Sequence, residues 1–204
     1  MSKFYAILLL TCSLLLSWQL PAQSLSKSFS HKDFESAEKS SDYIKFEGKS
    51  TKFGLVTTSF GGIVKDFSVS AEKRGQAIGN IIVKFPIEKM DTDSESRDEK
   101  MHGLCFDSKK YKELKIEFKR PIFAGDKEKT VDAEMTIRGK KKKIKIKISA
   151  VIEAGKLVAK GGTTLDFEYL EIPDPSIAIA SVDKNFNINF NVAIELPKEA
   201  PKKK

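Results

Sequence analysis

The sequence VDAEMTIRGKKKKIKIKISAVI, at residues 131–152, places an apolar side chain at every second position over two consecutive arms. A basic, Gly-containing link at residues 138–143 joins the arms. A period of two is typical of a β-strand with one buried face, whereas a helix spaces its apolar residues three and four apart. The segment therefore predicts a β-hairpin. Because two strands cannot bury an apolar face alone, the rest of the chain is expected to supply further strands around a shared interior.

Similar alternation recurs along most of the chain. It is clearest at residues 185–196, where apolar side chains alternate mainly with Asn. Further strands are predicted at residues 43–47, 52–60, 63–71, 77–87, 112–119, 156–160 and 163–169. Gly61-Gly62 and Gly161-Gly162 are predicted to link strands, because Gly adopts turn conformations without steric cost. Short links favour antiparallel pairing, so the sequence predicts an all-β fold with a single antiparallel barrel of eight strands, or eight to ten.

Residues 90–107 interrupt the strand pattern. They are rich in charge, and residues 91–94 (Asp-Thr-Asp-Ser) are good helix caps, so one or two helical turns are predicted at residues 96–103. This short helical segment is expected to cover one mouth of the barrel as a lid. Arg97 has two interpretations: it contacts the polar head of a ligand, with Met101 beside it, or it pairs with Asp98 to fix the loop.

The two ends of the chain differ from the predicted barrel. Residues 1–23 contain Lys3, a long apolar run and then small residues, a pattern typical of a secretory signal peptide, cleaved near Ala22 to Ser24. Residues 24–41 are rich in Ser and Lys and are predicted to form a flexible leader. Residues 198–204 are predicted to be a basic disordered tail. The barrel domain is therefore expected at residues 42–197 of a periplasmic or secreted protein.

Charge and composition limit the partners and the chemistry. The formal net charge of +8 suits an anionic membrane surface, and the absence of nucleic-acid-binding motifs argues against a nucleic-acid partner. Cys105 is alone after the predicted signal peptide, so we expect a buried thiol and no internal disulfide. With two His and no nucleophile or nucleotide motif, we expect neither an enzyme nor a metal or cofactor site. The sequence leaves monomer and homodimer open.

Four groups of residues give the chain a resemblance to a known family. They are Phe53-Gly54 with Phe60-Gly61-Gly62, Thr92 with Arg97-Asp98, Phe106-Asp107 with Lys110-Tyr111, and Met135-Thr136-Ile137-Arg138-Gly139-Lys140. Their types and their order over about residues 43–196 resemble the YceI-like proteins, which are exported barrels of lipocalin-like shape. The resemblance implies a YceI-like barrel that holds a long apolar chain, such as a polyisoprenoid, an isoprenoid quinone or a fatty amide.

The inward positions of the predicted strands, with two lid residues, form the predicted ligand-binding site. Its members are Phe53, Phe60, Phe67, Ile81, Val83, Phe85, Arg97, Met101, Leu114, Ile116, Phe118, Met135, Ile137, Phe186, Ile188 and Phe190. Alternation identifies the inward face but not what that face contacts, so ordinary core packing is the alternative. Two functions follow: a carrier or sequestering protein for an apolar lipid, or a filled barrel that docks on anionic surfaces through the basic hairpin tip at residues 138–143.

Overall fold

The computed structural model describes residues 22–125 and 127–197. Most of the predicted signal peptide and the whole predicted tail lie outside these residues. The elements are, in order, β1 (Gln23–Ser30), α1 (Phe34–Glu38), β2 (Tyr43–Lys52), β3 (Val56–Val64), β4 (Asp66–Arg74), β5 (Ala77–Pro86), the 3₁₀-helix η1 (Ile87–Lys89), β6 (Met90–Asp91), α2 (Glu95–Lys100), the π-helix η2 (Met101–Cys105), β7 (Glu113–Phe118), β8 (Ile122–Phe123), β9 (Lys129–Ile137), β10 (Lys140–Glu153), β11 (Lys156–Asp166), β12 (Ala180–Val182) and β13 (Asn185–Glu195).

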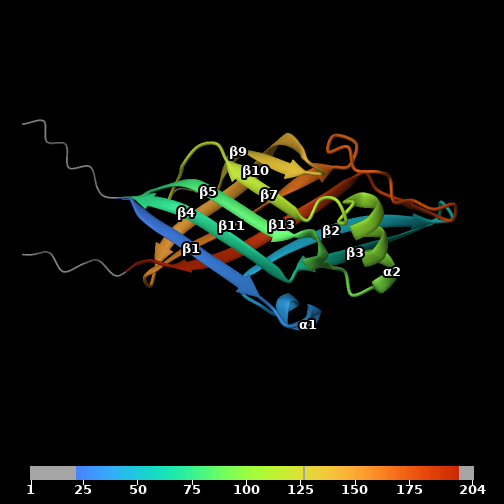
Figure 1. Ribbon diagram of the computed structural model, residues 1–204, viewed down its shortest axis with the longest axis horizontal. Coiled ribbons are helices and arrows are strands. Elements are labelled where there is room, and N and C mark those ends of the chain that lie inside the picture. The colour runs from blue at the N-terminus through green and yellow to red at the C-terminus, as the bar shows by residue number, and fades with distance from the viewer. Residues whose placement is uncertain (1–21, 126, 198–204) are drawn as a thin grey trace, which may run out of the picture.

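One curled antiparallel sheet contains all of these strands, which confirms the predicted all-β, barrel-like fold (Figure 1). Its main order is β1-β4-β5-β7-β9-β10-β11-β13-β2-β3-β6, while β8 pairs with β5 and β12 pairs with β2. The described residues form 13 strands rather than eight to ten. The excess arises because β6, β8 and β12 are only two or three residues long and because β1 lies in the predicted leader.

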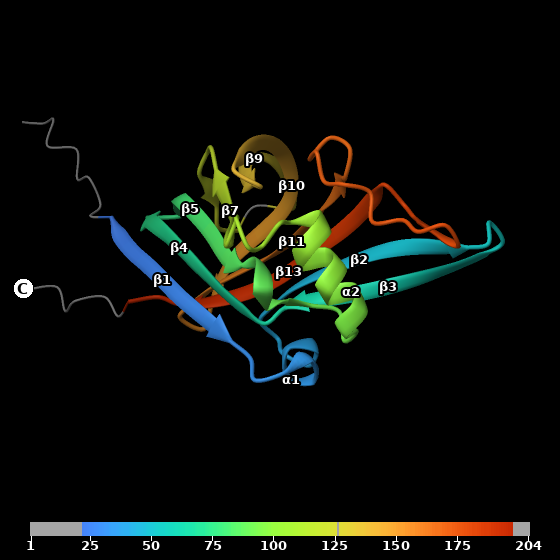
Figure 2. The same ribbon diagram turned by 45° about the vertical axis from the view of Figure 1, so that its right-hand side comes forward.

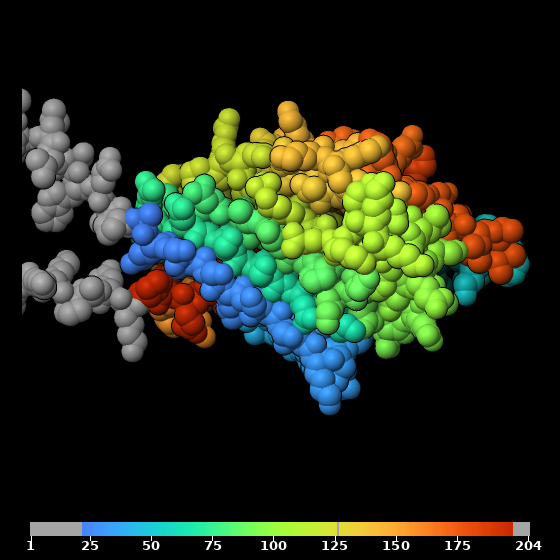
Figure 3. Space-filling view, in the orientation of Figure 1, coloured from blue at the N-terminus to red at the C-terminus, as the bar shows by residue number. Residues whose placement is uncertain are grey.

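The prediction of a flexible leader at residues 24–41 is wrong. Residues 23–30 form β1, which pairs with β4 from Gln23 opposite Lys73 to Ser30 opposite Asp66. Its side chains at positions 25 and 29 are buried, and the Phe29 ring stacks on Phe67 with 4.4 Å between the ring centroids. In the space-filling view β1 runs along the surface beside β4, with the end of β13 next to its beginning (Figure 3).

Both Gly pairs lie inside strands rather than at turns. A Cβ atom on Gly62 would lie 2.2 Å from a ring atom of Phe46, and one on Gly161 would lie 2.0 Å from the carbonyl oxygen of Lys147. Only Gly fits where neighbouring groups approach so closely. The predicted strands at residues 156–160 and 163–169 are consequently joined in one strand, β11, which ends at Asp166. The β2–β3 turn lies at Phe53 and Gly54, whose φ angles are 50° and 67°.

A helical segment, α2 with η2, lies at one end of the barrel beside β2 and β3 (Figures 1 and 2). It begins after Ser94 and ends at Cys105, close to the predicted helical turns at residues 96–103. The β2–β3 hairpin projects past this segment, away from the end where β1 begins and β13 ends (Figure 2).

Candidate functional site

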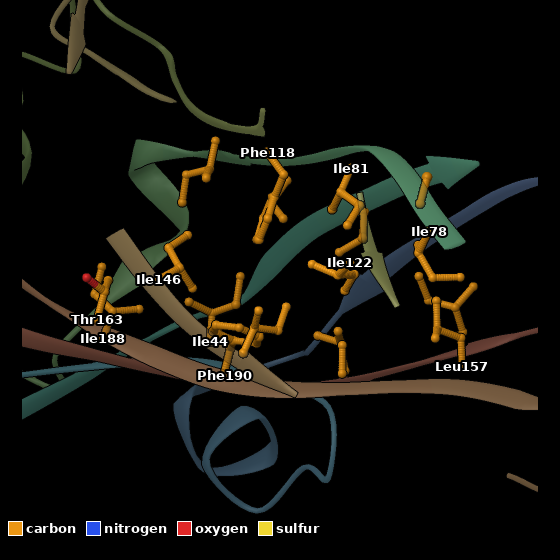
Figure 4. Close-up of a pocket in the computed structure, with 18 of the residues that line it drawn as sticks. Ile44, Ile78, Ile81, Phe118, Ile122, Ile146, Leu157, Thr163, Ile188 and Phe190 are labelled. Carbon is orange, nitrogen blue, oxygen red and sulfur yellow. The ribbon is translucent and has the colours of Figure 1, made fainter. Parts of the chain in front are cut away.

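The barrel interior contains an apolar cavity of about 90 Å³. Side chains of β5, β7 and β8 face those of β2, β11 and β13 across it, as Ile81 and Phe118 do opposite Ile44 and Phe190 (Figure 4). Nineteen residues line the cavity, and all are apolar except Thr163. The site is therefore built for contacts with hydrocarbon rather than for polar recognition.

A second apolar cavity of about 20 Å³ adjoins the first. Ile44, Phe85 and Ile188 line both cavities, so these three side chains form the partition between them. The smaller cavity extends towards the helical segment, because Met90 and Phe106 also line it. A longer continuous space would require the partition to move.

Most of the predicted site residues line one of these cavities. They are Ile81, Val83, Phe85, Leu114, Ile116, Phe118, Met135, Ile137, Phe186, Ile188 and Phe190. Phe67 is buried against Phe29 and lines neither cavity, and Met101 packs against the core. The placement of Phe53 in the barrel wall is wrong: it is 73% exposed, because it occupies the β2–β3 turn rather than a strand.

Twelve residues of the larger cavity were not predicted as site residues. They are Ile44, Val69, Ala71, Ile78, Ile122, Ile146, Ile148, Leu157, Ala159, Thr163, Val192 and Ile194. Several belong to the same alternating apolar runs as the predicted site residues. Ile146 and Ile148 continue the alternation of the hairpin at residues 131–152, and Val192 and Ile194 continue that of residues 185–196. Extending each alternating run to its end would have identified these positions.

Arg97 and Asp98 fix the loop before α2. The Asp98 carboxylate accepts hydrogen bonds from the backbone N–H of Thr92 at 2.9 Å and from its hydroxyl at 2.7 Å. Arg97 Nη2 donates to the carbonyl oxygen of Thr92 at 2.8 Å, and its guanidinium lies 5.8 Å from the centroid of the half-buried Phe60 ring. These contacts match the loop-fixing interpretation. Contact between Arg97 and a ligand head group stays a prediction.

Carboxylates accompany the basic hairpin tip. Lys140 and Lys142 both form ion pairs with Glu171, and their hydrogen bonds lower the pKa of that carboxyl to about 2. Lys141 Nζ lies 2.9 Å from a carboxylate oxygen of Glu134. Three lysines of the tip are therefore partly neutralised within the protein, which weakens the basic patch as an anion-binding surface.

Cys105 lies at the end of η2 and is 4% exposed. Burial raises the pKa of its thiol to about 11, because the apolar surroundings disfavour the thiolate. At neutral pH the group is a small apolar side chain.

Within residues 22–125 and 127–197, no group of three or more His, Cys, Asp or Glu side chains could hold a metal ion. In the part of the chain that the structure describes, no helix has the length and apolar content needed to cross a membrane.

Comparison with known proteins gives one family. The YceI-like domain model matches residues 36–194. None of the curated proteins matches this chain significantly in sequence.

Three solved structures share the fold. BcnA of Burkholderia cenocepacia superposes with a TM-score of 0.59 at 15% identity, covering 74% of this chain and 95% of that one. A polyisoprenoid-binding domain of Saccharophagus degradans gives 0.56 at 11% identity, covering 76% and 94%. The YceI protein of Campylobacter jejuni gives 0.55 at 17% identity, covering 67% and 85%. With the family model matching most of the chain, this protein belongs to the YceI-like domain family.

Proposed function

We propose that the barrel binds the hydrocarbon chain of a lipid and acts as its carrier or sequestering protein. The observation that supports this most directly is the apolar cavity of about 90 Å³ at the centre of the sheet. An empty apolar cavity lowers stability by about 24 cal/mol per Å³, so this one costs about 2 kcal/mol when nothing fills it. Hydrocarbon carbons placed there recover this loss and add the free energy of leaving water.

A long chain fits if the partition between the two cavities opens. An apolar cavity of about 150 Å³ holds one benzene molecule, so the two spaces together accommodate only part of a polyisoprenoid at rest. We propose that Ile44, Phe85 and Ile188 change rotamer as the chain enters and join the cavities into one channel. Each buried CH₂ contributes about 0.8 kcal/mol, so ten carbons give about 8 kcal/mol before the costs of ordering the chain.

The ligand class rests on the family and on the apolar wall. The Saccharophagus relative of similar fold is a polyisoprenoid-binding domain. The cavity wall here contains no charged group, which suits a neutral, branched or linear hydrocarbon such as a polyisoprenoid, an isoprenoid quinone or the tail of a fatty amide. No chemical step is required of the protein, so we propose a binding protein rather than an enzyme.

The proposed place of action is the periplasm or the extracellular space. The support is the signal-peptide pattern of residues 1–23. An exported carrier of this kind would hold a water-insoluble chain outside the cytoplasm, where a folded barrel shields it from water.

Organic extraction of the protein purified after export, followed by mass spectrometry, tests the proposal. We expect a co-purified isoprenoid-type lipid, and uptake of a hydrophobic fluorescent probe by protein from which the lipid has been removed. Phe85→Arg places a charge in the partition, and Ile137→Arg places one in the smaller cavity. Both should abolish uptake, with some loss of stability. Neither lipid nor uptake in the unaltered protein would contradict the proposal.

A further inference from the structure

Five large apolar side chains are exposed together at one end of the molecule. Phe53, Leu55 and Val56, in the β2–β3 turn and the first residue of β3, are 73%, 86% and 58% exposed. Ile177 and Ile179, in the loop before β12, are 51% and 53% exposed. Backbone pairing holds the two segments together, since β12 pairs with β2 and Phe53 N–H donates to the carbonyl oxygen of Ile179 at 2.9 Å. We call residues 49–57 and 176–182 the apolar tip.

The apolar tip projects from the barrel rather than forming a groove. The β2–β3 hairpin extends beyond the body of the molecule, with the residue 176–182 loop beside its end (Figures 2 and 3). Phe53 also adopts a left-handed conformation with φ of 50°, where Asn or Gly is usual. Contiguous exposed apolar surface of this kind marks an interaction site rather than ordinary surface.

All charges within the apolar tip are positive. Between residues 48 and 64 the ionisable side chains are Lys49 and Lys52 alone, and residues 175–182 contain none. Neither lysine forms an ion pair among the described residues. The carboxylates of Glu47, Asp174 and Asp183 flank the two segments but form no ion pair with these lysines, in contrast to Glu134 and Glu171 at the basic hairpin tip.

We propose that the apolar tip docks the protein on an anionic phospholipid bilayer. A convex group of apolar side chains enters the soft boundary between head groups and acyl chains without needing a complementary groove. Lys49 and Lys52 then lie at the level of anionic head groups, where each cation strengthens binding. A symmetric contact with a second copy is the alternative, and the experiment below separates it from the bilayer.

Docking in this way presents to the lipid the end of the barrel that holds the smaller cavity. The inward face of β2 runs from Ile44 in the partition to Phe46 in the smaller cavity and on to Gly48, over which the Phe60 ring lies. The apolar tip begins at the next residue. A hydrocarbon chain leaving the bilayer would therefore meet apolar side chains at the end of the tip and again from Gly48 inward, with Ser50 and Lys52 between them. The passage of a chain between bilayer and cavity rests on the proposed function, whereas docking itself does not require an occupied cavity.

Vesicle flotation of the exported form of the protein tests the docking. The vesicles contain phosphatidylcholine alone or with phosphatidylglycerol. We expect binding to the anionic vesicles, a loss of about tenfold or more in Phe53→Ser/Leu55→Ser, and in Lys49→Ser/Lys52→Ser a loss of the preference for anionic vesicles. Phe123→Ser is the matched control: this Phe is 47% exposed on β8, outside the apolar tip, and its replacement should leave flotation unchanged.

Two outcomes would overturn the inference. One is unchanged flotation of Phe53→Ser/Leu55→Ser together with loss on replacing Lys140–Lys143 by Ser, which would assign docking to the basic hairpin tip. The other is no vesicle binding with concentration-dependent dimers that Phe53→Ser/Leu55→Ser abolishes, which would assign the apolar tip to a second copy. Uptake of a soluble hydrophobic probe, measured without vesicles, should be normal in every tip variant. If the unaltered protein takes up no probe, the proposal that the cavity binds a lipid chain is contradicted, and the docking result is unaffected.

Discussion

Lys27 and Asp42 join the first strand of the barrel to the last through side chains rather than through a backbone ladder. Lys27 Nζ lies 3.1 Å from the Asp42 carboxylate and donates to the carbonyl oxygen of Ala193 at 2.8 Å. The N–H of Ala193 in turn donates to Asp42 at 2.7 Å. β1 has a backbone ladder with β4 alone, so this cluster connects it to β13.

The first prediction concerns this junction. Asp42→Ala leaves the part-buried N–H of Ala193 without its acceptor and removes the carboxylate that pairs with the Lys27 ammonium, so it should lower the free energy of unfolding by about 1–3 kcal/mol. Asp183→Ala is the control, because the exposed Asp183 side chain forms no hydrogen bond or ion pair with the other residues that the structure describes, so its loss of stability should be near zero. Urea denaturation measures both. Equal stability of the two variants would show that the junction does not hold the barrel together.

The second prediction tests whether residues 23–30 are part of the fold. Phe29 is 6% exposed and stacks on Phe67, so Phe29→Ala should cost about 3–5 kcal/mol by loss of burial and creation of a cavity. Phe53→Ala, at a site 73% exposed, should change stability by less than about 0.5 kcal/mol. Chemical denaturation separates these cases, and a negligible effect of Phe29→Ala would restore the interpretation of this segment as a leader.

The third prediction concerns the thiol of Cys105. Its pKa in the folded protein is about 11, above the ordinary 9.0, so folding favours the neutral thiol. The stability that the neutral Cys105 thiol contributes is complete below about pH 9 and is lost as the pH rises towards 11. At pH 8 a thiol reagent should react slowly with the native protein and rapidly in denaturant.

Comparison with Cys105→Ala isolates the alkaline effect from that of the lysines. The free energy of unfolding of the unaltered protein should fall more steeply above pH 9 than that of the variant. Rapid modification of the native thiol at pH 8, or parallel pH profiles, would contradict the account of Cys105 as a buried neutral group.

The fold could be predicted from the sequence where alternation is uninterrupted. β9, β10 and β13 alternate between apolar and polar side chains over most of their lengths, and each lies close to its predicted position. β1 was missed because Lys27 occupies an inward position between Leu25 and Phe29. A charged residue at an inward position interrupts the alternation. The Lys27 ammonium is nevertheless paired with the Asp42 carboxylate and the Ala193 carbonyl oxygen, which are distant in sequence.

The Gly pairs were misinterpreted for a related reason. Gly61-Gly62 and Gly161-Gly162 resemble turns locally, but they are Gly because Phe46 and the backbone of β10 approach them from other strands.

The cavity could not be predicted either, because it also depends on contacts between residues that are distant in sequence. Period two identifies inward side chains, but whether a space remains between them depends on how side chains from distant strands meet. The partition of Ile44, Phe85 and Ile188 could not be derived from any one strand.

Whether the barrel interior holds a hydrocarbon chain is tested most directly by filling the cavity with a larger apolar side chain and measuring the affinity for an apolar ligand. Ala71 lines the larger cavity and is 5% exposed, so Ala71→Leu should occupy part of that space and preserve the fold. Ser70→Val, one residue away on the opposite face of β4, is the control. Fluorescence titration with a hydrophobic probe, after lipid removal, should give tight binding in the unaltered protein and in Ser70→Val, and affinity weaker by about tenfold or more in Ala71→Leu. Equal affinity in all three proteins, or no binding in any of them, would contradict the claim that the barrel interior holds a hydrocarbon chain.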